Sequence, residues 1–166
     1  MVKDIHEALV KCNAHDGMTV SFHHHFREGD LVVCMVMEEI HKMGFKNITL
    51  SASSLGKAHD ALVPMIEDGT IVNIESSGVR GKIGDAISHG KLKGGRVRAI
   101  ETGETHVDIA FIGAPSCDEY GNCSGMGGKT NCGVLSYAYV DAEMADYVVA
   151  VTDCLVDYPN YPAEIN

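Results

Sequence analysis

The stretch that decides the fold covers residues 18–52 and reads MTVSFHHHFREGDLVVCMVMEEIHKMGFKNITLSA. It begins and ends with short β-branched and apolar runs, residues 18–22 and 47–52, which are typical of strands. Between them, residues 30–43 follow a helical pattern, with Asp30 as the N-cap and Gly44 closing the helix. A strand, a helix and a second strand in this order predict a βαβ unit with parallel strands.

The same alternation continues along the chain. Further strands are predicted at residues 70–74, 107–112 and 147–152, and further helices at residues 58–67 and 82–88. We expect Pro64 to kink the first of these helices. Residues 1–166 are therefore predicted to form a single α/β domain with a mostly parallel sheet and flanking helices.

One stretch interrupts this pattern. Residues 113–133 contain six glycines and three cysteines and have no regular period. An irregular loop of this length inside a compact domain usually serves a function, so we expect a functional loop here. Within it, Gly121 and Asn122 can bring the backbone close to a ligand or can simply form a turn.

The composition excludes several classes of protein. The 166 residues include 13 Lys and Arg against 23 Asp and Glu, and a net charge of −10 argues against non-specific nucleic-acid binding. The longest apolar run, residues 31–37, is far shorter than the roughly 18 residues of a membrane span. The start of the chain has no apolar signal region. We therefore expect a soluble, cytoplasmic protein with no membrane or nucleic-acid partner.

The six cysteines form no C-x-x-C pair, which argues against the usual zinc and thioredoxin motifs. A chain of this length does not need disulfides to be stable, so we expect reduced and mostly structural thiols. No Cys/His pairing can be read from the order of residues, and no catalytic cysteine is predicted.

The charge is distributed unevenly. Residues 80–98 contain a single acidic residue, Asp85, and six basic ones: Arg80, Lys82, Lys91, Lys93, Arg96 and Arg98. An acidic protein that binds an anion must concentrate positive potential somewhere, and this segment is the candidate. A solvated basic loop is the alternative.

Three histidines form the first candidate site. Ser21 lies near the end of the first predicted strand, and His23, His24 and His25 follow the strand, ahead of Arg27. Open α/β sheets bind ligands at the carboxyl ends of their strands. His23 and His25 share one face if the strand continues, so they can ligate zinc or iron, contact an anionic ligand, or be structural. No third metal ligand is evident nearby, and we predict anion contact without a metal.

A glycine-rich turn forms the second candidate site. Residues 75–85 read ESSGVRGKIGD, follow a predicted strand and open a helix. Backbone N–H groups at such a turn can bind an anion or an oxyanion. The candidate residues here are Ser77, Gly78, Arg80, Gly81 and Lys82, and a flexible, solvated loop is the alternative. Ser53 and Ser54 follow the second predicted strand and can line the same crevice.

Four stretches together resemble the citrate lyase alpha chain family, whose members are citrate CoA-transferase subunits. They are SFHHHFREGD at residues 21–30, SSGVRGK at 76–82, CDEYGN at 117–122 and YVDAEMAD at 139–146. The resemblance runs over nearly the whole chain and implies an α/β fold of the CoA-transferase type (NagB/RpiA/CoA-transferase-like). It also implies a longer protein with two similar halves, of which this chain is the N-terminal one. Between Lys91 and Gly95 the chain is shorter than the family usually is.

The resemblance implies that citrate replaces acetate on a CoA-type thioester, carried by an acyl carrier prosthetic group or by acetyl-CoA. The implied partners are citrate, an acyl carrier subunit and a lyase beta subunit, and self-association is left open. Citrate carboxylates suit His23, His25, Arg27 and Arg80 as contacts.

The family's catalytic glutamate is expected outside this chain, and Glu75 is not expected to replace it. The chain alone is therefore expected to bind poorly and to be inactive. The alternatives are a metal-dependent enzyme that uses His23 and His25, a sugar-phosphate isomerase of similar fold, and a non-catalytic scaffold in a lyase complex.

Overall fold

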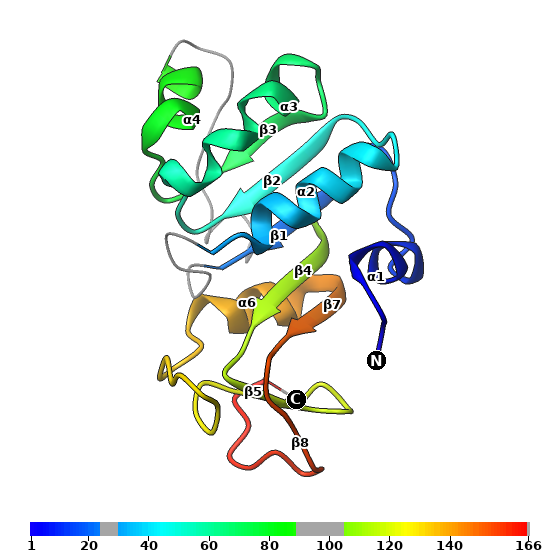
Figure 1. The fold of residues 1–166 in the computed structure, drawn as a ribbon, viewed down its shortest axis with the longest axis vertical. Coiled ribbons are helices and arrows are strands. Elements are labelled where there is room, and N and C mark those ends of the chain that lie inside the picture. Colours follow the sequence, from blue (N-terminus) through cyan, green and yellow to red (C-terminus); the bar gives the residue numbers. More distant parts are fainter. Residues whose placement is uncertain (24–29, 89–104, 166) are drawn as a thin grey trace.

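A computed structural model describes residues 1–23, 30–88 and 105–165 of the chain. Its centre is a five-stranded parallel sheet with the strand order β3-β2-β1-β4-β7 (Figure 1). These strands are β1 (Thr19–Phe22), β2 (Ile48–Ala52), β3 (Ile71–Glu75), β4 (Val107–Gly113) and β7 (Ala145–Val151). The predicted α/β fold with a mostly parallel sheet is confirmed.

Helices connect the strands and cover the sheet. They are α1 (Ile5–Lys11), α2 (Val32–Lys42), the 3-10 helix η1 (Lys57–Leu62), α3 (Val63–Glu67), α4 (Gly81–Ala86) and α6 (Tyr137–Met144). The main core joins buried residues of α2, such as Met37, to the sheet, where the ring of Phe22 stacks on that of Phe111 at 5.4 Å. Figure 1 shows α6 beside β4 and β7. Among the helices of the described ranges, none is long and apolar enough to cross a bilayer.

The predicted βαβ unit is confirmed, since β1 and β2 pair in parallel. Helix α2 begins slightly later than expected, with Leu31 as the N-cap, but Oδ1 of Asp30 still accepts the N–H of Val32 at 2.7 Å. Gly44 follows the helix with a φ of +85°, as a closing glycine does. The predicted kink at Pro64 is wrong. Pro64 lies in the first turn of α3, where its missing N–H costs no hydrogen bond, and η1 precedes it as a separate helix.

The prediction of an irregular loop at residues 113–133 is also wrong in part. The loop contains β5 (Ser116–Asp118) and β6 (Cys123–Ser124), which form a second sheet with β8 (Leu155–Val156). Strands this short leave no periodic signal in the sequence. The glycines allow backbone segments to pack directly, because a side chain at Gly128 would overlap the carbonyl of Pro115.

Candidate functional site

One face of the main sheet carries a row of polar side chains, which we call the polar row. Ser21 of β1 is in register with Ser51 of β2, and Ser51 is in register with Glu75 of β3. Because side chains alternate along a strand, His23 and Ser53 continue this face two residues further on. Ser21 and Ser51 are fully buried, and His23 nearly so. Strands in the middle of a parallel sheet are normally apolar on both faces, so a buried polar row indicates a functional site.

His23 lies where the strand order reverses, between β1 and β4. The backbone N–H of Gly113 donates a hydrogen bond to Nε2 of His23 at 2.9 Å. This nitrogen therefore carries no proton of its own. The bond joins the carboxyl ends of two neighbouring strands, at the crevice where open α/β sheets bind ligands.

The alternative of a metal enzyme that uses His23 and His25 is not supported. Nε2 of His23 is occupied by the Gly113 amide, and His25 lies outside the described residues. His24 and Arg27 also lie outside them.

Ser21 connects the sheet to α6. Its hydroxyl donates to Oδ2 of Asp141, and both side chains are buried. A buried carboxylate requires hydrogen-bond donors, so this contact stabilises the charge at the sheet face. Asp141 therefore belongs to the candidate site, although it lies 120 residues from Ser21.

Two buried oxygens of the polar row have no hydrogen-bond partner among the described residues: Oγ of Ser53 and Oε2 of Glu75. The other carboxylate oxygen of Glu75 accepts from the hydroxyl of Thr105 at 2.9 Å. The backbone N–H of Ser53 donates to the carbonyl of Phe22 at 3.2 Å, which fixes Ser53 beside the end of β1. Buried polar atoms without partners are costly, and a bound ligand or water would satisfy them.

The glycine-rich turn lies against the loop that follows β2. The N–H of Leu55 donates to the carbonyl of Gly78 at 3.0 Å, and the N–H of Arg80 donates to the carbonyl of Leu55 at 2.9 Å. The side chains of Ser54, Ser77, Arg80 and Lys82 are exposed, as is Gly78. The carboxyl ends of β1, β2 and β3 thus lie together in the structure. From the sequence, the residues that follow these strand ends are expected to line one crevice.

A carboxylate already lies at the start of α4. Oδ1 of Asp60 accepts the N–H of Ile83 at 3.4 Å, and a Cβ at Gly81 would lie 2.6 Å from the same oxygen. The negative charge of Asp60 disfavours the binding of a second anion by the backbone N–H groups at the start of α4. The rest of the basic segment, Lys91, Lys93, Arg96 and Arg98, lies outside the described residues, as does the short region between Lys91 and Gly95.

Gly121 and Asn122 lie in the turn between β5 and β6, where Asp118 organises the backbone. The Asp118 carboxylate accepts hydrogen bonds from the N–H groups of Tyr120, Asn122 and Asn160 at 3.0–3.1 Å, and from Nδ2 of Asn122 at 2.7 Å. Burial raises the pKa of Asp118, but the hydrogen bonds together lower it by more than burial raises it. The pKa of Asp118 therefore lies below its ordinary value. Gly121, with a φ of +92°, completes the turn. That Gly121 and Asn122 contact substrate stays a prediction.

A cleft of about 380 Å³ runs beside the edge strand β7. Its lining comprises Tyr120, Gly121, Tyr139, Ala142, Glu143, Val148, Ala150 and Ile165. Gly121 is a predicted site residue in this lining, but the polar row lies on β1–β3 instead. Because the buried polar atoms gather in the polar row, we place the candidate site at the polar row rather than in the cleft.

All six cysteines are free thiols. Cys117 and Cys123 face each other across β5 and β6, with their sulfur atoms 3.4 Å apart. The hydrogen bond between them lowers the pKa of Cys117 and raises that of Cys123. Both are buried among apolar residues, as expected of structural thiols.

The predictions missed Ser51, Glu75 and Asp141 as members of the site. The signal for the first two is present in the sequence, because polar residues recur at every second position of three strands: 19, 21 and 23; 49, 51 and 53; 73 and 75. Such alternation places the polar residues on one face. No local pattern indicates Asp141, since its partner is far away in the sequence.

Comparisons with known proteins show which family the chain resembles. The family model described as "Citrate lyase, alpha subunit (CitF)" matches residues 1–166. The citrate lyase alpha chain of Escherichia coli K12 is 49% identical over 170 residues, which cover 98% of this chain and 33% of that relative. This chain thus spans about a third of the length of the curated relatives it matches.

Solved structures show the same likeness. The alpha subunit of citrate lyase from Streptococcus mutans, in complex with citrate, superposes with a TM-score of 0.90 at 51% identity, over 99% of this chain and 34% of that one. An acyl-CoA transferase from Escherichia coli O157:H7 superposes with a TM-score of 0.72 at 14% identity, over 99% of this chain and 44% of that one. At that identity the second likeness shows the fold alone, and the fold is that of a CoA-transferase.

Proposed function

The chain belongs to the citrate lyase alpha-subunit family, and on this premise we propose that its polar row binds citrate for an acyl exchange on a CoA-type thioester. The observation that carries the proposal is the buried hydroxyl of Ser53 and the buried Oε2 of Glu75, which have no partner among the described residues. The citrate complex of the Streptococcus mutans relative supports citrate as the ligand.

The polar row suits the chemistry of citrate. The Ser53 hydroxyl donates to a citrate carboxylate, and Oε2 of Glu75 accepts from the citrate hydroxyl. The remaining negative charge of citrate requires cations, and Arg80 and Lys82 stand exposed at the neighbouring turn. Arg27, which the sequence predicts as a further contact, lies outside the described residues.

In the proposed reaction, acetyl thioester and citrate give citryl thioester and free acetate. The bond from the acetyl carbonyl carbon to sulfur breaks, and that carbon takes one oxygen from an enzyme carboxylate to leave as acetate. A citrate carboxyl carbon gives up one oxygen to the same enzyme carboxylate and forms a bond to the sulfur, which restores the carboxylate. Backbone N–H donors at the strand ends stabilise the oxyanion that develops, with one well-placed donor contributing on the order of 3 kcal/mol. The carboxylate nucleophile comes from a part of the longer protein outside these 166 residues, which form the N-terminal α/β domain.

The proposed carriers of the thioester are an acyl carrier subunit or CoA itself, and a lyase beta subunit is the proposed third partner. The curated relatives are citrate lyase chains, and CoA-transferases share the fold, which supports this assignment. On this proposal the chain alone binds citrate but does not catalyse the acyl exchange.

A chimera tests the function. The matching third of the Escherichia coli alpha chain is replaced by this chain, and release of acetate from acetyl-CoA on addition of citrate is measured. In Ser53→Ala, loss of one hydrogen bond to a charged ligand should raise the KM for citrate about tenfold. The matched control is Ser88→Ala, since the exposed Ser88 hydroxyl already donates to the carbonyl of Gly84 at 3.0 Å. A folded chimera without exchange overturns the activity, and an unchanged KM in Ser53→Ala overturns the placement of citrate.

A further inference from the structure

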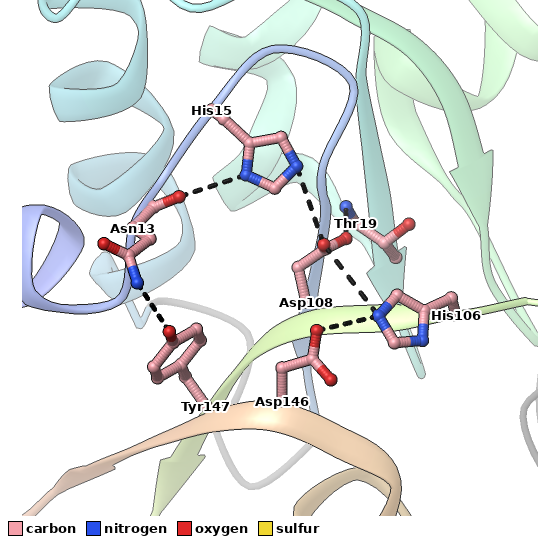
Figure 2. Close-up of polar contacts among 7 residues, drawn as sticks. All are labelled: Asn13, His15, Thr19, His106, Asp108, Asp146 and Tyr147. Atoms are coloured by element: carbon pink, nitrogen blue, oxygen red, sulfur yellow. Dashed lines mark hydrogen bonds and ion pairs between the residues drawn. The ribbon is translucent and has the colours of Figure 1, made fainter.

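Four metal-ligating side chains gather at the amino-terminal ends of the strands, at the opposite end of the sheet from the carboxyl-end crevice. Asp108 is the second residue of β4 and Asp146 the second residue of β7. His106 precedes β4, and His15 lies in the loop that leads into β1. Figure 2 shows these side chains pointing toward one another. The candidate citrate site uses none of them.

The distances suit a single ion. Nε2 of His106 lies 2.9 Å from Oδ2 of Asp146 and 4.0 Å from Oδ1 of Asp108, and these three ligand atoms all lie within 4.8 Å of one another. Nε2 of His15 lies 3.7 Å from the same oxygen of Asp108. In a tetrahedral zinc site with bonds of about 2.0–2.1 Å, the ligand atoms lie about 3.3 Å apart. His106, Asp108 and Asp146 already form a set of mutually close ligand atoms, and His15, which lies outside that set, must move further than they do to complete the geometry.

The outer contacts of two ligands orient them toward the centre. Oδ2 of Asp108 accepts the backbone N–H of Thr19 at 2.7 Å, which leaves Oδ1 directed at the histidines. Nδ1 of His15 lies 3.0 Å from the carbonyl of Asn13, and a proton on that nitrogen leaves the lone pair of Nε2 facing Asp108. Metal-ligating histidines and carboxylates typically have such outer partners.

A third contact fixes the loop that carries His15. Nδ2 of Asn13 donates to the hydroxyl of Tyr147 on β7 at 2.6 Å (Figure 2). The loop before β1 is therefore tied to the edge strand by a contact that needs no ion. This anchoring is what distinguishes the cluster from a chance meeting of exposed acidic groups.

We propose that His15, His106, Asp108 and Asp146 bind one divalent transition-metal ion, with Zn²⁺ as the best match. Two imidazole nitrogens and two carboxylate oxygens are a ligand set that Zn²⁺ accepts, and the two carboxylates balance its charge. The ion links the loop before β1, strand β4 and edge strand β7, so it acts as a structural clasp. This site is independent of the proposed citrate chemistry.

The state without metal agrees with this assignment. His106 and Asp146 are more than half exposed, so an ion can enter from solvent.

Two measurements on the EDTA-treated 166-residue protein at pH 7.5 test the proposal. They are calorimetric titration with ZnCl₂ and the melting temperature of the protein with and without Zn²⁺. We expect one Zn²⁺ per chain and a rise in melting temperature. His106→Gln and Asp146→Asn should each weaken Zn²⁺ binding tenfold or more. The matched control is His6→Gln, because His6 is similarly exposed and its Nδ1 also contacts a carboxylate, that of Glu39, at 2.9 Å. Circular dichroism confirms that the variants fold.

Cobalt separates this site from the cysteines. Co²⁺ bound by imidazole and carboxylate groups gives d–d absorption without a thiolate charge-transfer band. Such a band would overturn the proposal, as would Zn²⁺ binding that survives both His106→Gln and Asp146→Asn. Equal weakening in His6→Gln, or less than one ion per chain at saturation, would also overturn it.

Discussion

The backbone N–H of Gly113 and Nε2 of His23, 2.9 Å apart, join the carboxyl ends of β4 and β1. This is the point where the strand order reverses, and the acceptor nitrogen belongs to the first residue of the triple-histidine stretch. His23 therefore has a structural role in shaping the crevice, whatever it contributes to ligand binding.

Removal of this acceptor should destabilise the protein. In His23→Ala the N–H of Gly113 loses its partner, and we expect the free energy of unfolding to fall by about 1–3 kcal/mol. His23→Gln should recover part of the loss, because an amide oxygen can accept the same N–H. Urea unfolding followed by circular dichroism gives both values. Equal losses in the two variants would contradict the assigned role of the hydrogen bond.

The contact between Ser21 and Asp141 should appear as an energetic coupling. The pair connects β1 to α6 within the buried polar face, so Ser21→Ala removes the donor and Asp141→Asn replaces the charged acceptor with a weaker, neutral one. In a double-mutant cycle of Ser21→Ala and Asp141→Asn, we expect a coupling of at least about 1 kcal/mol in the free energy of unfolding. Additive effects of the two substitutions would show that the groups act separately.

The sequence predicts the sheet well because its strands are β-branched runs set between capped helices, as residues 18–52 illustrate. It does not predict α6, because the apolar residues of Tyr137–Met144 do not gather on one side of the helix. The second sheet escapes prediction because β6 has only two residues and β5 three. Each of these elements is determined by tertiary packing rather than by local pattern.

The candidate site was predictable where the signal is local. His23 and Ser53 follow strand ends, and the polar alternation through Ser51 and Glu75 can be read directly from the sequence. The pairing of Ser21 with Asp141 depends on how α6 docks on the sheet, which no spacing encodes.

A side chain at Gly128 should destabilise the second sheet. Its Cβ would overlap backbone atoms of Pro115, which cannot rotate away as a side chain can. We expect Gly128→Ala to lower the free energy of unfolding by about 1–3 kcal/mol, as overpacking typically does. Gly78→Ala is the matched control, because a Cβ there has no atom within 4 Å. Similar melting temperatures for the two variants would show that the loop adapts.

Asp68 should make stability depend on pH in the acid range. Hydrogen bonds from the hydroxyl and the N–H of Thr70, with a smaller contribution from Lys46, lower the pKa of Asp68 from 3.8 to about 2. A carboxyl whose pKa is lower in the folded state stabilises the fold above its unfolded pKa of 3.8. That contribution is lost as the pH falls through the folded pKa, between about pH 4 and pH 2. We therefore expect Asp68→Asn to lower the free energy of unfolding at pH 7. The difference in this free energy between the variant and the unsubstituted protein should become smaller as the pH falls from about 4 to about 2.

Urea midpoints measured from pH 7 down to pH 2 test this expectation, and an NMR titration of the Asp68 carboxyl carbon reports the folded pKa directly. Glu67→Gln is the control, because Glu67 is the neighbouring exposed carboxylate on α3. A carboxyl carbon of Asp68 that titrates near 3.8 would mean that the contacts with Thr70 and Lys46 do not hold the charge in solution, and the difference between the proteins would then stay constant with pH.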